Sequence, residues 1–86
     1  MERERNFLDI AAEILQIAVH GVKKKHVVGK VNLNSKVIHE YLDRMEETEL
    51  ITYNEGEIKT TEEGIECLKN YEDFMKYMES SLSSLI

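Results

Sequence analysis

The sequence has no proline, one cysteine and only four glycines among its 86 residues. Because clusters of turn-forming residues are missing, no flexible linker is visible, and the length favours a single small domain with a modest core. One cysteine rules out an internal disulfide framework and suits a reducing compartment. No apolar run approaches the roughly 20 residues that a membrane-spanning helix needs. We therefore expect a cytoplasmic protein that does not bind a membrane.

Acidic residues are also missing from one long stretch, since no aspartate or glutamate lies between Glu13 and Glu40. Residues 14–39 carry a charge of +5, whereas the rest of the chain, with six basic and 17 acidic residues, carries −11, which gives the net charge of −6. An acidic protein that keeps one window free of carboxylates has a candidate surface for a polyanion. The window holds all three histidines and five lysines: Lys23, Lys24, Lys25, Lys30 and Lys36.

Apolar spacing predicts a first helix over residues 7–19, with a broad buried face that includes Phe7 and Leu8. The charged residues 1–6 are expected to be its frayed start, and Gly21 can adopt the left-handed conformation that ends a helix. Val22 then begins a short extended piece.

A helix-turn-helix follows, with helices predicted over residues 25–31 and 35–48 around a turn at residues 32–34. Asn34 or Ser35 is expected to cap the second of these helices. Gly29 either allows another helix to approach closely or weakens its own helix by up to about 1 kcal/mol. In a helix-turn-helix the second helix can lie in a DNA major groove.

A β-hairpin and a long helix complete the chain. Residues 50–54 and 57–60 predict two strands joined at Glu55-Gly56, which together would form a wing. Thr60 and Glu63 predict a capping box for a helix that runs to about residue 83, on the order of 35 Å. Ile65 is expected to close the core of the domain.

The far half of this last helix is too long for so small a core to cover, and a second copy of the chain is the simplest partner. Apolar residues follow one another along it in steps of three and four, which is a heptad seam. The predicted dimerisation residues are Leu68, Tyr71, Met75, Met78, Leu82 and Leu85.

This order of elements resembles the small archaeal winged-helix DNA-binding proteins, which dimerise through a long C-terminal antiparallel coiled-coil helix. The likeness covers about residues 7–82. Its most specific pieces are GVKK at residues 21–24, VNLN at 31–34, Tyr41-Leu42, Leu50-Ile51 and KTTEEG at 59–64. The resemblance implies a mostly α (α+β) winged helix-turn-helix with a two-stranded wing and a long C-terminal helix forming a dimer coiled coil. Residues 1–64 would form the winged domain, and residues 65–86 the dimerisation helix continuous with it.

Three features depart from the pattern of that family. Glu40 stands where a basic or neutral residue is commoner, and Glu49 stands where such chains usually carry glycine. The wing tip is acidic, with Glu55 and Glu57 beside its glycine.

The resemblance and the basic window together place DNA contacts on the starts of the second and third helices. The lysines, Lys36 included, would neutralise phosphates. Lys36 could instead bond a guanine edge, Val37 could meet a thymine methyl, and His39 could do either, depending on its protonation. The predicted partners are double-stranded DNA and a second copy of the chain, in a nucleoid-associated transcriptional regulator. The full set of predicted DNA-binding residues is Lys23, Lys24, Lys25, His26, Lys30, Asn34, Ser35, Lys36, Val37 and His39.

Two other functions stay open. One is a protein-interaction module that has lost DNA binding and uses the acidic end of the third helix, the wing and the last helix. The other is RNA binding through the same basic window.

We expect no enzyme activity, no cofactor and no metal ion. His20, His26, His39 and Cys67 lie 6, 13 and 28 residues apart, which matches no metal-ligand spacing. Neither a nucleophile with a neighbouring base nor a glycine-rich phosphate loop accompanies the paired acids.

Overall fold

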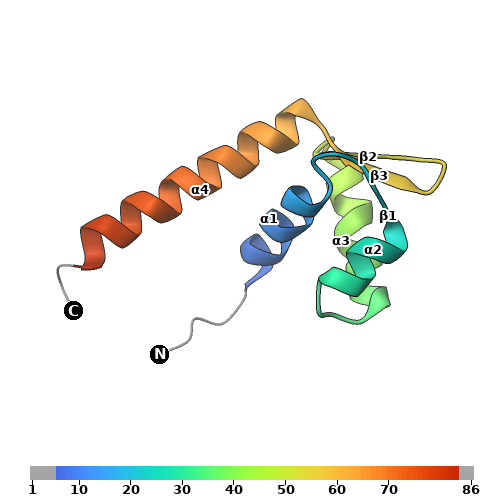
Figure 1. The fold of residues 1–86 in the computed structure, drawn as a ribbon, viewed down its shortest axis with the longest axis horizontal. Coiled ribbons are helices and arrows are strands. Elements are labelled where there is room, and N and C mark those ends of the chain that lie inside the picture. The colour runs from blue at the N-terminus through green and yellow to red at the C-terminus, as the bar shows by residue number, and fades with distance from the viewer. Residues whose placement is uncertain (1–5, 84–86) are drawn as a thin grey trace.

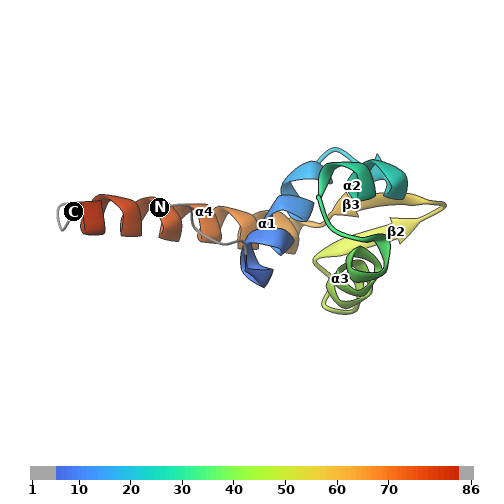
Figure 2. The ribbon, with the colours of Figure 1, turned by 90° about the horizontal axis from the view of Figure 1, so that it is seen from below.

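The computed structural model describes residues 6–83, in which three short helices and a small sheet form a domain and one long helix runs away from it (Figures 1 and 2). The predicted class, a mostly helical winged helix-turn-helix with a long C-terminal helix, is confirmed. The elements are α1 (Phe7–Ile17), β1 (Val22–Lys23), α2 (Lys24–Lys30), α3 (Ser35–Glu47), β2 (Ile51–Asn54), β3 (Glu57–Thr60) and α4 (Glu62–Leu82).

The sheet has three antiparallel strands in the order β1-β3-β2, one more than the predicted two-stranded wing. Ile58 of β3 lies opposite Val22 on one side and Tyr53 on the other. The hairpin turns at Glu55 and Gly56, whose φ angles of 53° and 81° both lie in the left-handed region. A two-residue turn with two positive φ angles matches the right-handed twist of the strands, so the predicted wing is confirmed.

The core draws on all four helices and on strands β2 and β3. α3 contributes Ile38, Leu42 and Met45, as its spacing predicts, and α4 contributes Leu68. The prediction for Ile65 is wrong: this side chain is 45% exposed, because Gly64 and Leu68 hold the inward positions of α4. The buried apolar residues are Ile10, Ile14, Leu15, Ala18, Val27, Val31, Ile38, Leu42, Met45, Ile51, Ile58 and Leu68.

Gly64 lets α4 lie directly against the loop before β2. A methyl group added at Gly64 would sit 2.3 Å from the Leu50 carbonyl oxygen and 3.1 Å from Cδ2 of Leu15. One added at Gly29 would meet nothing of residues 6–83 within 4 Å apart from its chain neighbours and the backbone of its own helix. Of the two roles open to Gly29, close approach is therefore excluded.

The start of α1 differs from the prediction. Asn6 is its N-cap, because the Asn6 side chain accepts from the Asp9 backbone and Asp9 accepts from the Asn6 backbone in return. The helix therefore begins at a defined capping box at Asn6 and Phe7, while residues 1–5 of the predicted frayed start lie outside the described residues.

The cap of α3 is as predicted, since Oδ1 of Asn34 accepts from the Val37 backbone at 2.9 Å. The predicted cap of α4 is wrong by one residue. Thr61 is the N-cap and accepts from the Gly64 backbone at 3.0 Å. Thr60 is instead the last residue of β3, and its buried hydroxyl donates to the Leu15 carbonyl of α1 at 2.7 Å.

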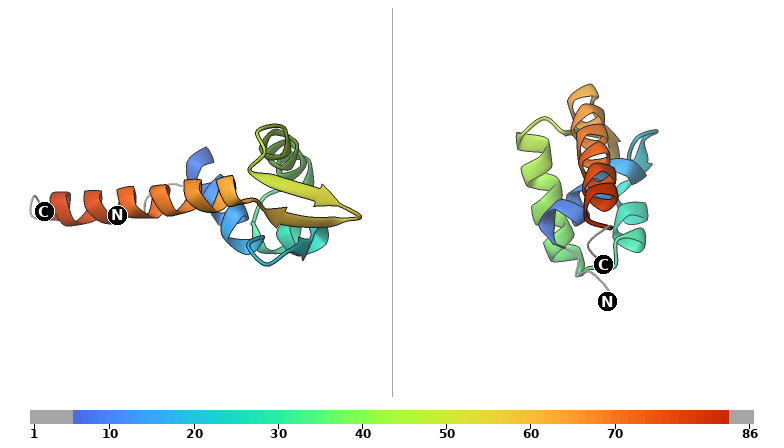
Figure 3. Two further views of the ribbon diagram at one scale, coloured as in Figure 1. Left: turned by 90° about the horizontal axis from the view of Figure 1, so that it is seen from above. Right: turned by 90° about the vertical axis from the view of Figure 1, so that its left-hand side faces the viewer.

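Viewed along α4, helices α2 and α3 lie on opposite sides of it (Figure 3, right). The left panel shows the second half of α4 running clear of the domain. Within residues 6–83 no helix combines the length and the apolar character needed to cross a membrane.

Candidate nucleic-acid interface

A shallow groove of about 590 Å³ separates the start of α2 from the wing. We call it the α2–wing groove. It brings together four of the predicted DNA-binding residues with three that sequence reasoning did not single out for the site. Its lining is Lys23, Lys24, Lys25, Val28, His39, Tyr53 and Gly56.

Lys24 is the half-buried centre of this groove. Its ammonium contacts Nε2 of His39 and lies 5.8 Å from the centroid of the Tyr53 ring, within the range of a cation–π interaction. Lys24 therefore links α2 to both α3 and β2.

His39 is held from both sides of its ring. Nδ1 lies 2.7 Å from the Ser35 carbonyl oxygen, and a carbonyl can only accept, so Nδ1 carries the hydrogen. Nε2 then presents its lone pair to the ammonium of Lys24. Both ring nitrogens are thus engaged within the chain.

The other basic residues of the window lie around the groove. Lys23 and Lys25 line it with exposed side chains. His26 and Lys30 are exposed on α2 but do not line it. The five lysines predicted to share one surface therefore divide into a cluster at the groove and two outlying cations, Lys30 on α2 and Lys36 on α3.

The start of α3 presents fewer free polar groups than its sequence suggests. Asn34 is occupied as the helix cap, and Val37 is half-buried. Ser35 and Lys36 are exposed. The helical period puts Lys36 on the side opposite the buried Ile38.

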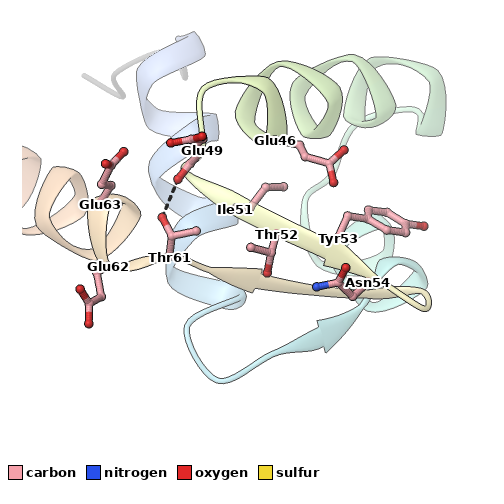
Figure 4. Close-up of a pocket in the computed structure, with 9 residues that line it drawn as sticks. All are labelled: Glu46, Glu49, Ile51, Thr52, Tyr53, Asn54, Thr61, Glu62 and Glu63. Carbon is pink, nitrogen blue, oxygen red and sulfur yellow. Dashed lines mark hydrogen bonds between the residues drawn. The ribbon is translucent and has the colours of Figure 1, made fainter.

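Negative charge gathers on a different groove, of about 540 Å³, at the far end of α3 (Figure 4). In the close-up the Thr61 hydroxyl donates to the Glu49 carbonyl oxygen at 2.7 Å and joins the two walls. Tyr53 lines both grooves, so the wing separates a basic surface from an acidic one. The lining is Glu46, Glu49, Ile51, Thr52, Tyr53, Asn54, Thr61, Glu62 and Glu63.

The predicted dimerisation seam divides into two parts. Leu68 is buried in the core, and the Tyr71 hydroxyl donates to Asp9 of α1, so both pack within the chain. Met75 and Met78 are half-buried and Leu82 is exposed. Leu85 lies outside the described residues.

Large apolar side chains that sequence reasoning did not assign to an interface are also exposed. Phe74 is 60% and Tyr77 70% exposed on α4. Phe7 and Leu8 are exposed on α1, which corrects their predicted burial: Ile10, Ile14 and Leu15 hold the inward positions of this helix. The sequence identifies all four as large apolar side chains, but its periodicity does not say which of them remain exposed to solvent in a single chain.

No three histidine, cysteine or acidic side chains within residues 6–83 come together as ligands for a metal ion, and Cys67 is a free, exposed thiol.

Comparison with known families finds a match over residues 4–79 to a family described as winged helix-turn-helix. No curated protein sequence matches the chain.

Proposed function

Because this chain belongs to the winged helix-turn-helix family, we propose that it is a homodimeric DNA-binding protein that regulates transcription. The α2–wing groove is the observation that carries this proposal. Three consecutive lysines meet there on one surface of a protein whose net charge is −6. A local basic surface on an acidic chain favours binding of a polyanion at a defined place over general coating of DNA.

In this mechanism the lysines contact the phosphate backbone of the DNA, and side chains of α3 contact the base edges. Lys23 and Lys25, both exposed, contact phosphates and set the register of the protein on the duplex. Lys24 holds the wing and α3 in place beside them. Only the first turns of α3 enter the major groove, because its far end carries the acidic groove. The wing tip stays clear of phosphates, since Glu55 and Glu57 would repel them.

A second copy is the partner proposed for α4. Contiguous exposed apolar patches on a monomer mark interaction sites, and Phe74, Tyr77 and Leu82 are exposed close together along α4. Since Leu68 and Tyr71 pack against the chain's own α1 and core, we place the start of the dimerisation segment after Tyr71, later than the residue 65 that the sequence predicts.

The test is a titration of duplex DNA of random sequence over a series of salt concentrations, run beside a mass measurement of the free protein. The double variant Lys23→Glu/Lys25→Glu is compared with Lys69→Glu/Lys76→Glu, which changes the charge equally on α4. The first variant should flatten the slope of log affinity against log salt by about 0.9 for each phosphate that it no longer neutralises, about 2 in all. Equal weakening by both variants, or no binding by the wild type at low ionic strength, would contradict the proposal.

The acidic groove favours a second candidate, a protein-interaction module that binds a basic segment of another protein. Its lining contains Glu46, Glu49, Glu62 and Glu63, a concentration of charge that DNA would avoid. A wild-type protein that binds a lysine-rich peptide but no duplex, and loses the peptide on Glu46→Gln/Glu62→Gln, would support this candidate. In the salt-series titration, preference for structured RNA over duplex DNA of equal length would instead indicate RNA binding.

A further inference from the structure

Few polar side chains on the first two turns of α3 are free to contact bases. Asn34 is engaged as the cap, and both ring nitrogens of His39 are engaged by Ser35 and Lys24. The exposed residues that remain near the start of the helix are Ser35, Lys36 and Glu40.

Lys36 and Glu40 occupy the most outward positions of this part of α3. Successive residues of an α-helix turn by about 100°, so both lie opposite the buried Ile38 and Leu42. They are four residues apart, which stacks them on one stripe with their Cβ atoms roughly 6 Å from each other. That separation corresponds to one or two base-pair steps of about 3.4 Å.

Resting on the DNA-binding function proposed above, we infer that Lys36 and Glu40 are the pair that determines sequence specificity. Lys36 carries only donors, and guanine offers two adjacent acceptors, O6 and N7, in the major groove. Lys36 therefore selects guanine.

Glu40 carries only acceptors when ionised, so it needs a base that donates. Cytosine N4 and adenine N6 are the donors in the major groove, but adenine places its acceptor N7 beside N6, where it would repel a carboxylate. Glu40 therefore selects cytosine. The preferred site holds a guanine and a cytosine one or two base pairs apart.

The same carboxylate lowers affinity for other sequences. At a base pair without a suitably placed amino group, Glu40 would be desolvated without a partner and would face negative charge on the DNA. Glu40 on the outward stripe thus weakens binding to DNA of random sequence and discriminates between DNA sites.

The experiment selects binding duplexes from a randomised pool with the wild type and with Glu40→Gln. Glu47→Gln is the matched control, because it makes the same change on the same stripe farther from the start of α3. Glutamine pairs with adenine through N6 and N7. We expect the wild type to select the cytosine, Glu40→Gln to select adenine at that position and to bind random duplex more tightly, and Glu47→Gln to keep the cytosine.

Direct titration then measures the size of the effect. Replacing the selected cytosine with adenine should weaken binding by the wild type about 10- to 100-fold and should strengthen binding by Glu40→Gln, which pairs with adenine. A Glu40→Gln variant that retains the base preference of the wild type overturns this inference and leaves DNA binding standing. A wild type that binds no duplex at low ionic strength overturns both. Circular dichroism verifies that each variant is folded.

Discussion

At the scale of single residues, Gly64 and Gly29 form a natural pair, because both lie in helices but meet very different surroundings. The Cβ of Gly64→Ala would lie 2.3 Å from the Leu50 carbonyl oxygen, which is backbone and cannot rotate away. We expect this variant to lower the free energy of unfolding by about 1–3 kcal/mol, the usual cost of overpacking. Gly29→Ala should raise it by up to about 1 kcal/mol, because alanine favours the helix and meets open space.

Urea denaturation followed by circular dichroism gives both values. The prediction requires that the two variants change the free energy of unfolding in opposite directions. If the two alanines have the same effect, helix propensity decides both positions and the close approach of α4 has no energetic importance.

The residues that sequence reasoning missed share one physical cause, which is competition from partners distant in sequence. Thr60 and Thr61 both offer a hydroxyl near the start of α4, but that of Thr60 is buried against the Leu15 carbonyl, 45 residues away, and Thr61 caps the helix. Tyr53 was predicted only as part of a strand, and it joins the candidate site because Lys24 reaches across to its ring. Local signals identified the cap Asn34 correctly, because its partner is three residues away.

At the scale of elements, the end of α3 contains a strained junction. The backbone N–H of Glu49 donates to Glu46 at 3.0 Å and that of Leu50 donates to Met45 at 2.9 Å, the two bonds of a Schellman motif. Glu49 itself has a φ of 63°, a conformation in which glycine is unstrained and glutamate is not. The fold thus keeps a geometry suited to glycine with another residue in its place.

Replacing Glu49 with glycine should therefore stabilise the protein. Relief of the left-handed strain outweighs the added freedom of the unfolded chain, and we expect a gain of about 0.5–1 kcal/mol. Glu47→Gly removes the same charge at the last residue of α3 and should cost up to about 1 kcal/mol. Thermal denaturation measures both, and a Glu49→Gly variant that melts below the wild type would contradict the assigned strain.

Periodicity and turn chemistry predicted the helices and the hairpin strands to within two residues at each end. α1 ends at Ile17 rather than residue 19, because the Ala18 carbonyl accepts from both Gly21 and Thr60 and closes the helix early. The sequence suggested only an extended piece at Val22. Val22 and Lys23 form the strand β1 because they pair with Ile58 and Glu57 of β3, which lie far along the chain. Strands this short are defined by their neighbours and leave little pattern of their own.

At the scale of the whole molecule, opposite charges and apolar surface occupy different regions. The basic groove lies between α2 and the wing, the acidic groove lies at the far end of α3, and exposed apolar side chains lie on α1 and on the second half of α4. The sequence predicted the basic window and the apolar stripe from composition and spacing. It could not predict that Leu68 and Tyr71 would be used inside the chain, since that depends on how α1 packs against α4.

The separation of these surfaces leads to a prediction that couples dimerisation to DNA binding. Met78→Glu/Leu82→Glu places two charges on the apolar stripe of α4, and we expect it to convert a dimer into a monomer by light scattering. The control Lys76→Glu/Ser80→Glu introduces two glutamates with the same spacing on another side of the helix and should remain a dimer.

Loss of the second copy removes the linked second binding event, which commonly raises apparent affinity by about 10²–10⁴-fold. The monomeric variant should therefore bind a duplex with two half-sites hundreds of times more weakly, yet bind a single half-site as the wild type does, because its α2–wing groove is intact. Equal affinity of both variants for the double site would show that one copy is sufficient, and the exposed face of α4 would then need a different partner to account for it.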